Sequence, residues 1–369
     1  MIYKLLSKWL LYHIIIIYDI YKVCVMPQHF LLNADARSLS PLAIARLSDD
    51  KAHAMLCELR WGSTENVICP KCGKQHKAYY ITTRRQWQCK SCRHRFSVTS
   101  STIFAHHKLP IRTILFACAI YVNAVKGISA LQLSRDLDVQ YKTAFVLAHK
   151  IRESIQAQRD LFPLSGEIHM DGSYIHSSVR EKNKKADRID RRLKVNENPD
   201  KRCVIVMRNR YTADEILANP QLAGAKSTFT FVALSENNKT ISNLAKLYIE
   251  PNSVIHTDEH PSYDNLLVGF DLKRVNHSQE YRSDDGITNN LAESYFSRFK
   301  RMYHGQVHKI DNVYLGDYAN EIAYREDTRR MSNGVIFHDV LSKCLKTPPS
   351  NDFKGYWQGN HRQSERLVA

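Results

Sequence analysis

The segment GEIHMDGSYIH, residues 166–176, marks the point where the chain changes its secondary structure. Apolar and polar residues alternate along it, which is the pattern of a half-buried β-strand. Further strands are predicted at RCVIVMRNR (202–210), TFTFVALS (228–235), SVIHTDEH (253–260) and KRVNH (273–277), and a helix at NNKTISNLAKLYI (237–249). Strands that come first and then alternate with helices indicate a mixed α/β sheet with helices on both faces.

Three acidic residues in this region share a predicted role. Asp171 and Asp258 each follow an alternating run, so both are predicted at or near strand ends, while Glu293 lies on a helix predicted over TNNLAESYFSRFKR (288–301). Three carboxylates gathered in a basic protein need cations to offset their charge. They suit two Mg²⁺ ions about 4 Å apart, the arrangement of a two-metal phosphoryl-transfer site.

Two Cys-x-x-Cys pairs precede this region. They are separated by sixteen residues, a spacing typical of a zinc ribbon in which four thiolates converge on one Zn²⁺. Gly73 follows the first pair and eases its tight turn. A redox role is disfavoured because no βαβ pattern surrounds either pair. The predicted zinc ligands are Cys69, Cys72, Cys89 and Cys92.

Residues 111–158 predict three helices between the ribbon and the sheet. SALQLSRDL, a short turn and YKTAFVLAHKIRESI resemble a helix-turn-helix, whose second helix would place Lys142 and Lys150 on DNA and would also expose His149. The alternative is a plain helical bundle that links two domains.

The charge balance points to a polyanionic partner. Of 369 residues, 53 are Lys or Arg and 37 are Asp or Glu, which gives a net charge of +16. Nucleic acid is the expected partner, and the alternative is an ordinary basic enzyme. The charged run 180–202 is either a solvated loop or an arm that contacts phosphates.

The remaining cysteines and the N-terminus bear on the compartment. Nine cysteines, five of them scattered, do not form a disulfide framework, and a reducing cytoplasm is expected, with the protein associated with the nucleoid. The apolar run near the start is interrupted by His13 and Asp19 and is shorter than the ~20 residues of a membrane span. Residues 1–25 are interpreted as an over-extended gene start, with a membrane-associating segment as the alternative.

The motifs CPKCG…WQCKSCRHRFSVTSSTIF, MDGSYI, IHTDEHPSY and TNNLAESYFSRFKR together resemble those of bacterial insertion-sequence transposases of the DDE superfamily, closest to the ISXO-type group. The resemblance covers roughly residues 40–324. It implies a ribonuclease H-like, retroviral-integrase-like α/β core in which a mixed sheet is flanked by helices, preceded by the zinc ribbon and the helix-turn-helix-like region.

The resemblance also assigns roles in the helix at 288–301. Asp171, Asp258 and Glu293 become the catalytic acidic triad that binds Mg²⁺ or Mn²⁺, and Lys300, followed by Arg301, becomes a DNA contact. Some members of the group have an asparagine as the third catalytic residue, and Asn290 lies one turn before Glu293. Glu293 is preferred as the ligand because it brings a negative charge.

The predicted activity is metal-dependent DNA cleavage and strand transfer at the ends of an insertion sequence. The expected partners are terminal inverted repeats, target DNA and a second copy of the chain, without a small-molecule substrate. The alternatives are a catalytically inactive DNA-binding regulator and an unrelated metal nuclease. The predicted divisions are the extension 1–25, a helical segment 26–64, the ribbon 65–105, the helix-turn-helix-like region 106–160, the catalytic domain 161–325 and a C-terminal tail 326–369.

Overall fold

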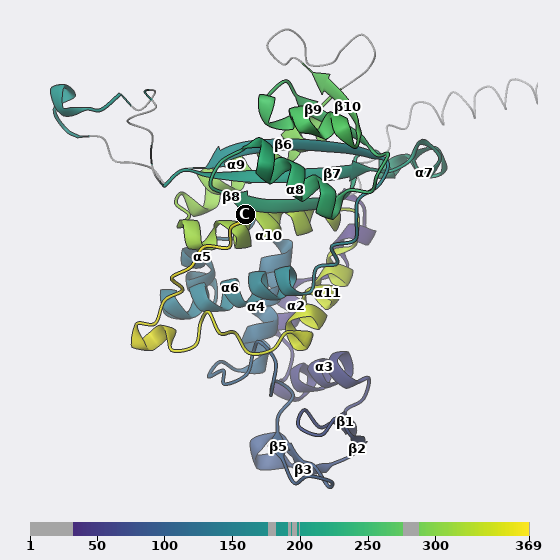
Figure 1. The fold of residues 1–369 in the computed structure, drawn as a ribbon. Coiled ribbons are helices and arrows are strands. Elements are labelled where there is room, and N and C mark those ends of the chain that lie inside the picture. The colour runs from purple at the N-terminus through teal and green to yellow at the C-terminus, as the bar shows by residue number, and fades with distance from the viewer. Residues whose placement is uncertain are drawn as a thin grey trace, which may run out of the picture.

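The computed structural model describes residues 32–175, 182–190, 193, 198, 200–275 and 288–368. Three parts follow one another along the long axis of the molecule: a small ribbon of short strands, a layer of helices, and an α/β part built on a five-stranded sheet (Figure 1). The N-terminal run at 1–25 lies outside the described residues, as do residues 180–181, 191–192, 194–197 and 199 of the charged run 180–202.

The five-stranded sheet is mixed, as the alternation predicted. Its order is β10 (Asp271–Val275), β9 (Val254–Asp258), β6 (Glu167–Ile175), β7 (Arg202–Arg210) and β8 (Ala225–Ala233). Strands β6, β7 and β8 form an antiparallel meander, whereas β9 and β10 run parallel to β6. The long central strands are apolar on both faces because helices cover both sides of the sheet.

Each face of the sheet has its own core. One face packs under α8 (Asn238–Tyr248) and the 3₁₀ helix η7 (Pro261–Val268). The other packs under α9 (Asn290–Met302) and α10 (Asn312–Asp327), whose buried side chains include Tyr295, Phe299 and Ile322. A short helix, α7 (Ala213–Ala218), follows β7. This arrangement places α9 over β6, which carries Asp171, and over the neighbouring strand β7.

The helical layer combines helices from the first half of the chain with one helix from its C-terminal part. It contains α2 (Pro41–Ala45), α3 (Asp49–Trp61), α4 (Ile111–Asn123), α5 (Ala130–Asp136), α6 (Tyr141–Ala157) and α11 (Asn333–Lys346). The prediction of a C-terminal tail from residue 326 is wrong for its first half, because Phe337, Leu341 and Cys344 of α11 lie in the same core as α4 and α6. Farther on, Val368 N donates to Val232 O of β8 at 2.8 Å.

Helix α6 is central to this layer and not an isolated recognition helix. Its Arg152, 2% exposed, donates to Glu321 of α10 at 2.6 Å. The predicted exposure of His149 is wrong: its ring is fully buried among aromatic side chains such as Tyr318 and Phe353, and burial lowers its pKa to about 4. Lys142 is exposed near the start of α6, and Lys150 is half-buried.

The ribbon consists of two short sheets. β1 (Asn66–Ile68) pairs with β2 (Gln75–Lys77), and β3 (Tyr79–Ile81), β4 (Gln86–Gln88) and β5 (Arg95–Phe96) form the second. Trp61 of α3 meets Trp87 edge to face with ring centroids 5.1 Å apart. These few aromatic contacts anchor the ribbon to α3. Within the described part of the chain, no helix is both long and apolar enough to cross a membrane.

Candidate metal centres

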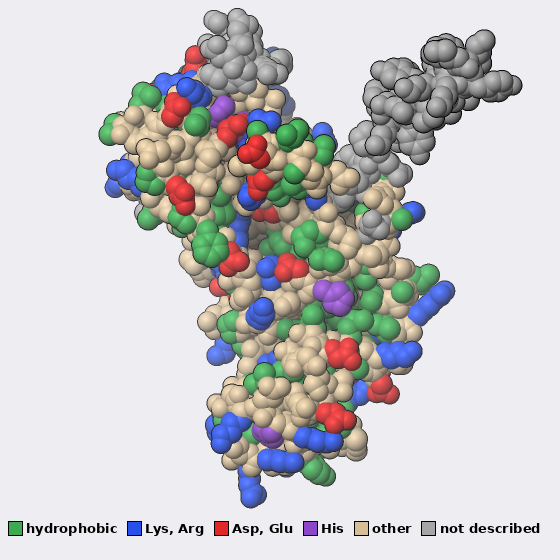
Figure 2. Space-filling model, turned by 90° about the vertical axis from the view of Figure 1, so that its right-hand side faces the viewer, with side chains coloured by type: hydrophobic (Ala, Val, Ile, Leu, Met, Phe, Trp, Pro, Cys, Tyr) green, Lys and Arg blue, Asp and Glu red, His purple; other side chains and the backbone are tan. Residues whose placement is uncertain are grey.

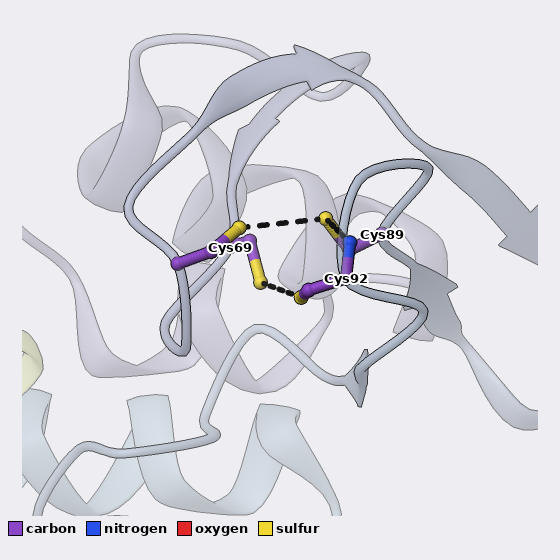
Figure 3. Close-up of side chains that lie close together, drawn as sticks. Cys69, Cys89 and Cys92 are labelled. Atoms are coloured by element: carbon purple, nitrogen blue, oxygen red, sulfur yellow. Dashed lines mark hydrogen bonds between the residues drawn. The ribbon is translucent and has the colours of Figure 1, made fainter.

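The four predicted zinc ligands converge at one end of the ribbon. The Sγ atoms of Cys69 and Cys92 lie 3.6 Å apart and those of Cys72 and Cys89 lie 3.7 Å apart. Figure 3 shows the labelled Cys69, Cys89 and Cys92 side chains pointing toward one another. Zn–S bonds of about 2.3 Å in a tetrahedron require sulfur atoms about 3.8 Å apart. The four thiolates therefore fit a structural Zn²⁺.

Each Cys-x-x-Cys pair lies on the same kind of backbone turn. Gly73 N donates to Cys69 O, and Arg93 N donates to Cys89 O in the same way. Gly73 and Arg93 both have positive φ, 69° and 57°. Burial opposes ionisation of Cys89, but backbone N–H groups of Cys92 and Ser91 donate to its sulfur, and its pKa falls to about 6. A thiolate is the form that binds zinc.

The second candidate centre begins with a repeated tetrapeptide pattern. Ile168-His169-Met170-Asp171 on β6 and Ile255-His256-Thr257-Asp258 on β9 share the order Ile-His-x-Asp. The strands are parallel, with Ile168 opposite Ile255 and His169 opposite His256. Asp171 and Asp258 each follow two residues after the last pair of this ladder, and the charge of Asp258 acts on Asp171. Alternate residues of a strand point to the same face. Asp171 is therefore on the same face of β6 as His169, two residues earlier, and Asp258 stands in the same relation to His256.

The two aspartates differ in their position within the strands. Asp258 is the last residue of β9, as predicted, whereas Asp171 is the fifth residue of β6 and not its end. Pairing with β7 extends β6 to Ile175, while the β6–β9 ladder stops at His169 and His256. Asp171 therefore lies just beyond the point where β6 loses its neighbour β9.

The electrostatics show that the acidic groups are close together. The pKa of Asp171 is raised from 3.8 to about 8, first by burial and then by the charges of Asp258, Glu236 and Glu293, against a hydrogen bond from Gly172 N that lowers it. The charges of three other carboxylates, one on α9, one at the end of β9 and one in the loop after β8, therefore act on Asp171. In the described part of the chain, the carboxylate oxygens of Asp171, Asp258 and Glu293 do not all lie within 4.8 Å of one another. One Mg²⁺ with bonds of about 2.1 Å would need a closer set, whereas two ions tolerate a wider one.

Two hydrogen bonds fix the start of α9 over the aspartates. Asn289, 1% exposed, donates through Nδ2 to Met170 O at 3.2 Å, next to Asp171. His256 Nδ1 lies 3.1 Å from Thr288 O. Glu293 follows in the first turn of α9, and it is half-buried, whereas Asn290 is exposed. The first turn of a helix favours a carboxylate because its N–H groups carry partial positive charge.

The basic residues at the other end of α9 lie in two settings. Lys300 is exposed and, seven residues after Glu293, falls on the same stripe about 10 Å further along the helix. Arg301 lines a cavity of about 380 Å³ between α4, α9, α10 and α11. Six basic side chains line this cavity with a single acidic one, Glu326; the six are Arg37, Lys126, Arg298, Arg301, Arg325 and Arg329.

Two residues of this region, Asn289 and Glu236, were not predicted from the sequence. Asn289 stands in the motif between Thr288 and Asn290. The sequence does not indicate that its amide is buried, because this depends on Met170 of the strand beneath it. Glu236 lies between β8 and α8 in a segment without a motif. Glu167, His169 and His256 form another close set, although Glu167 already pairs with Arg210 at 3.2 Å.

The unusual pKa of Asp171 leads to a stability prediction. The folded, metal-free protein keeps a proton that the unfolded chain releases between pH 4 and pH 8, so stability falls as pH rises through that window. Asp171→Asn removes this penalty. We expect the variant to unfold at a higher temperature than the wild type without Mg²⁺, with an advantage that grows by about 2 kcal/mol from pH 6 to pH 8. Thermal melts at both pH values measure this, and an advantage independent of pH would contradict it.

Two segments of the chain, which contain the two candidate centres, match known protein families. Residues 163–327, from β6 to the end of α10, match the ISXO2-like transposase domain, and residues 47–95, which hold all four zinc ligands, match the transposase zinc-ribbon domain. An uncharacterized protein in transposable element ISH50 of Halobacterium salinarum is 24% identical over 264 residues, covering 69% of this chain and 83% of that protein. The chain is therefore similar to ISXO2-like transposases over residues 163–327 and to the transposase zinc ribbon over residues 47–95.

Proposed function

We propose that the protein cleaves DNA at the ends of an insertion sequence and joins the freed 3′ ends to target DNA, in a reaction that depends on divalent metal ions. The observation that carries this proposal is the gathering of Asp171, Asp258 and Glu293 at the place where β6 and β9 separate. Buried carboxylates that repel one another need a cation, and hard oxygen donors select Mg²⁺ or Mn²⁺. We infer in addition that the α/β part is ribonuclease H-like, supported by its mixed sheet and flanking helices.

Each of the predicted site residues has a separate role in the proposed reaction. Asp171 and Asp258 hold the divalent ions from the sheet, and Glu293 holds them from α9. The ions, when bound, activate the attacking oxygen and stabilise the departing 3′ oxygen. Lys300, on the stripe of Glu293, contacts a phosphate of the bound strand. Asn290 orients Glu293 or a water molecule from its exposed position one turn earlier.

The decisive experiment uses a duplex that carries the element's terminal repeats. Nicking that requires Mg²⁺, followed by joining to a second duplex, supports the proposed function. Specific binding without nicking indicates a DNA-binding regulator, and nicking without joining indicates a metal nuclease. The Asp258→Asn variant, which removes one ligand charge, is the control for contaminating nucleases.

We infer that the ribbon contacts the DNA backbone, together with Lys142, Lys150 and Arg301. Residues 65–96 contain eight Lys or Arg and one acidic residue, Glu65. Figure 2 shows Lys and Arg side chains spread over the ribbon at the lower end of the molecule. A folded module with this charge releases counterions when it binds DNA. We further expect two copies of the chain on one pair of transposon ends.

Charge removal from the ribbon gives a testable result. We expect Lys71→Gln, Lys74→Gln and Lys90→Gln, combined in one protein, to reduce the slope of log K against log salt by up to about 2.7, since each phosphate contact contributes about 0.9. All three side chains are exposed. Fluorescence anisotropy from 50 to 200 mM salt measures the slope. The control is Lys239→Gln with Lys246→Gln on α8, and an equal change in both proteins would refute a ribbon contact.

A further inference from the structure

A glutamate outside the predicted motifs reaches the acidic centre from the opposite face of the sheet. Glu236 lies between β8 and α8, on the face that packs under α8, whereas Glu293 approaches from the α9 face. Its carboxyl group lies directly over Gly172, the residue after Asp171. A Cβ atom at Gly172 would come within 2.5 Å of Glu236 Cδ and 2.7 Å of both carboxylate oxygens. The absence of a side chain at Gly172 is therefore what admits Glu236.

Glu236 is held in place by two tyrosines. The hydroxyl of Tyr263, a fully buried residue of η7, donates to Glu236 Oε1. Glu236 N donates to the hydroxyl oxygen of Tyr174 on β6 at 3.0 Å. A hydrogen bond to one oxygen fixes the rotamer and leaves the other oxygen for a second partner. The side chain is thus oriented, like the ligands of metal sites whose outer partners fix them.

The charges around Glu236 are those of the predicted active site. Burial raises the pKa of Glu236, and Asp258 raises it further, while Glu236 in turn contributes to the raised pKa of Asp171. The hydrogen bond from Tyr263 and, to a smaller extent, the charge of His260 lower the pKa of Glu236. Asp171, Asp258 and Glu293 carry three negative charges between them, and two divalent ions carry four positive charges. A fourth carboxylate balances the sum.

We propose that Glu236 is a fourth carboxylate ligand of the divalent-metal centre, reaching Asp171 and Asp258 through the space above Gly172. This inference rests on the proposed function, because it assigns Glu236 to the same ions. Glu236 would hold the ions from the side of the sheet away from α9, and Glu293 would hold them from the α9 side. The role of Gly172 is then steric, and the role of Tyr263 is to position Glu236.

The test measures metal binding directly. Mn²⁺ serves as the probe, and bound ions are counted by electron paramagnetic resonance on the full-length, zinc-loaded protein without DNA. For E236Q we expect the weaker of two Mn²⁺ affinities to fall at least about tenfold, because a charged ligand becomes a neutral amide. G172A should reproduce the loss, since its methyl group displaces the end of a flexible side chain. The matched control is E259Q, an exposed carboxylate next to Asp258.

The outcomes separate this inference from the proposed function. Equal Mn²⁺ affinities for the wild type and E236Q overturn the role of Glu236, and if Asp258→Asn still abolishes binding, the acidic centre itself stands. Loss of affinity in E236Q and not in E259Q supports the fourth ligand. A wild-type protein that binds no Mn²⁺ and nicks no DNA overturns both. Thermal melts without Mn²⁺ check folding, and E236Q should be at least as stable as the wild type because it removes a buried repulsion.

Discussion

Glu293→Gln is expected to lower the rate of Mg²⁺-dependent cleavage at least about a thousandfold, whereas Asn290→Ala should leave a measurable rate. The substitution Glu293→Gln keeps the shape of the side chain and removes the negative charge that the divalent ions need. Metal ions contribute several kcal/mol of charge stabilisation in the transition state, and each 1.4 kcal/mol is about tenfold in rate. The burial of the two residues supports the distinction, because Glu293 is half-buried over the sheet and Asn290 is exposed.

Single-turnover nicking in Mg²⁺ separates the two residues. Asn290→Ala should cost about 10- to 100-fold, the usual loss when a partner that orients a ligand is removed. Binding of both variants to terminal repeats should match the wild type, which excludes misfolding as the cause. If Asn290→Ala is inactive and Glu293→Gln still cuts, the asparagine is the third ligand and the assignment to Glu293 is wrong.

Removal of zinc is expected to unfold the ribbon and abolish specific DNA binding. Structural Zn²⁺ contributes about 10–16 kcal/mol in small zinc domains, far more than the two short sheets of the ribbon could supply. In this chain the ligands Cys69 and Cys89 are themselves buried in the core that α3 and α4 share. Cys69→Ser should therefore loosen the aromatic contact between Trp61 and Trp87 as well as the turn at the metal.

Tryptophan fluorescence and hydrogen exchange measure the effect of Cys69→Ser. Protection should disappear in residues 65–96 and persist in β6, β7 and β8, whose cores contain no ribbon residue. Ser91→Ala is the control, because it changes an exposed residue between two ligands and keeps all four thiolates. A zinc-free protein that retains ribbon protection and binds terminal repeats normally would contradict the structural role of the metal.

Local patterns in the sequence were sufficient for most strands of the sheet, for helix α9 and for the zinc-binding turns. The strands at β6, β7 and β9 and the helix α9 follow from alternation and helical periodicity, which are properties of neighbouring residues. The zinc ligands follow from the spacing of two Cys-x-x-Cys turns, since each turn builds half of a tetrahedron by itself. The order of Asp171, Asp258 and Glu293 along the chain was also recognisable, because each lies in a motif.

Contacts between distant segments decided the rest. Helix α11 packs into the N-terminal core, and α6 is buried against α10 through Arg152 and Glu321, which are 169 residues apart. Glu236 lies over Gly172, where a side chain would collide with its carboxyl group, and the two residues are 64 positions apart in the sequence. The periodicity of the sequence does not predict such contacts, because they depend on which surfaces the folded chain brings together. The sequence by itself determined the strands, the metal-binding turns and the acidic motifs, whereas the tertiary structure decided which side chains are buried and which carboxylates meet.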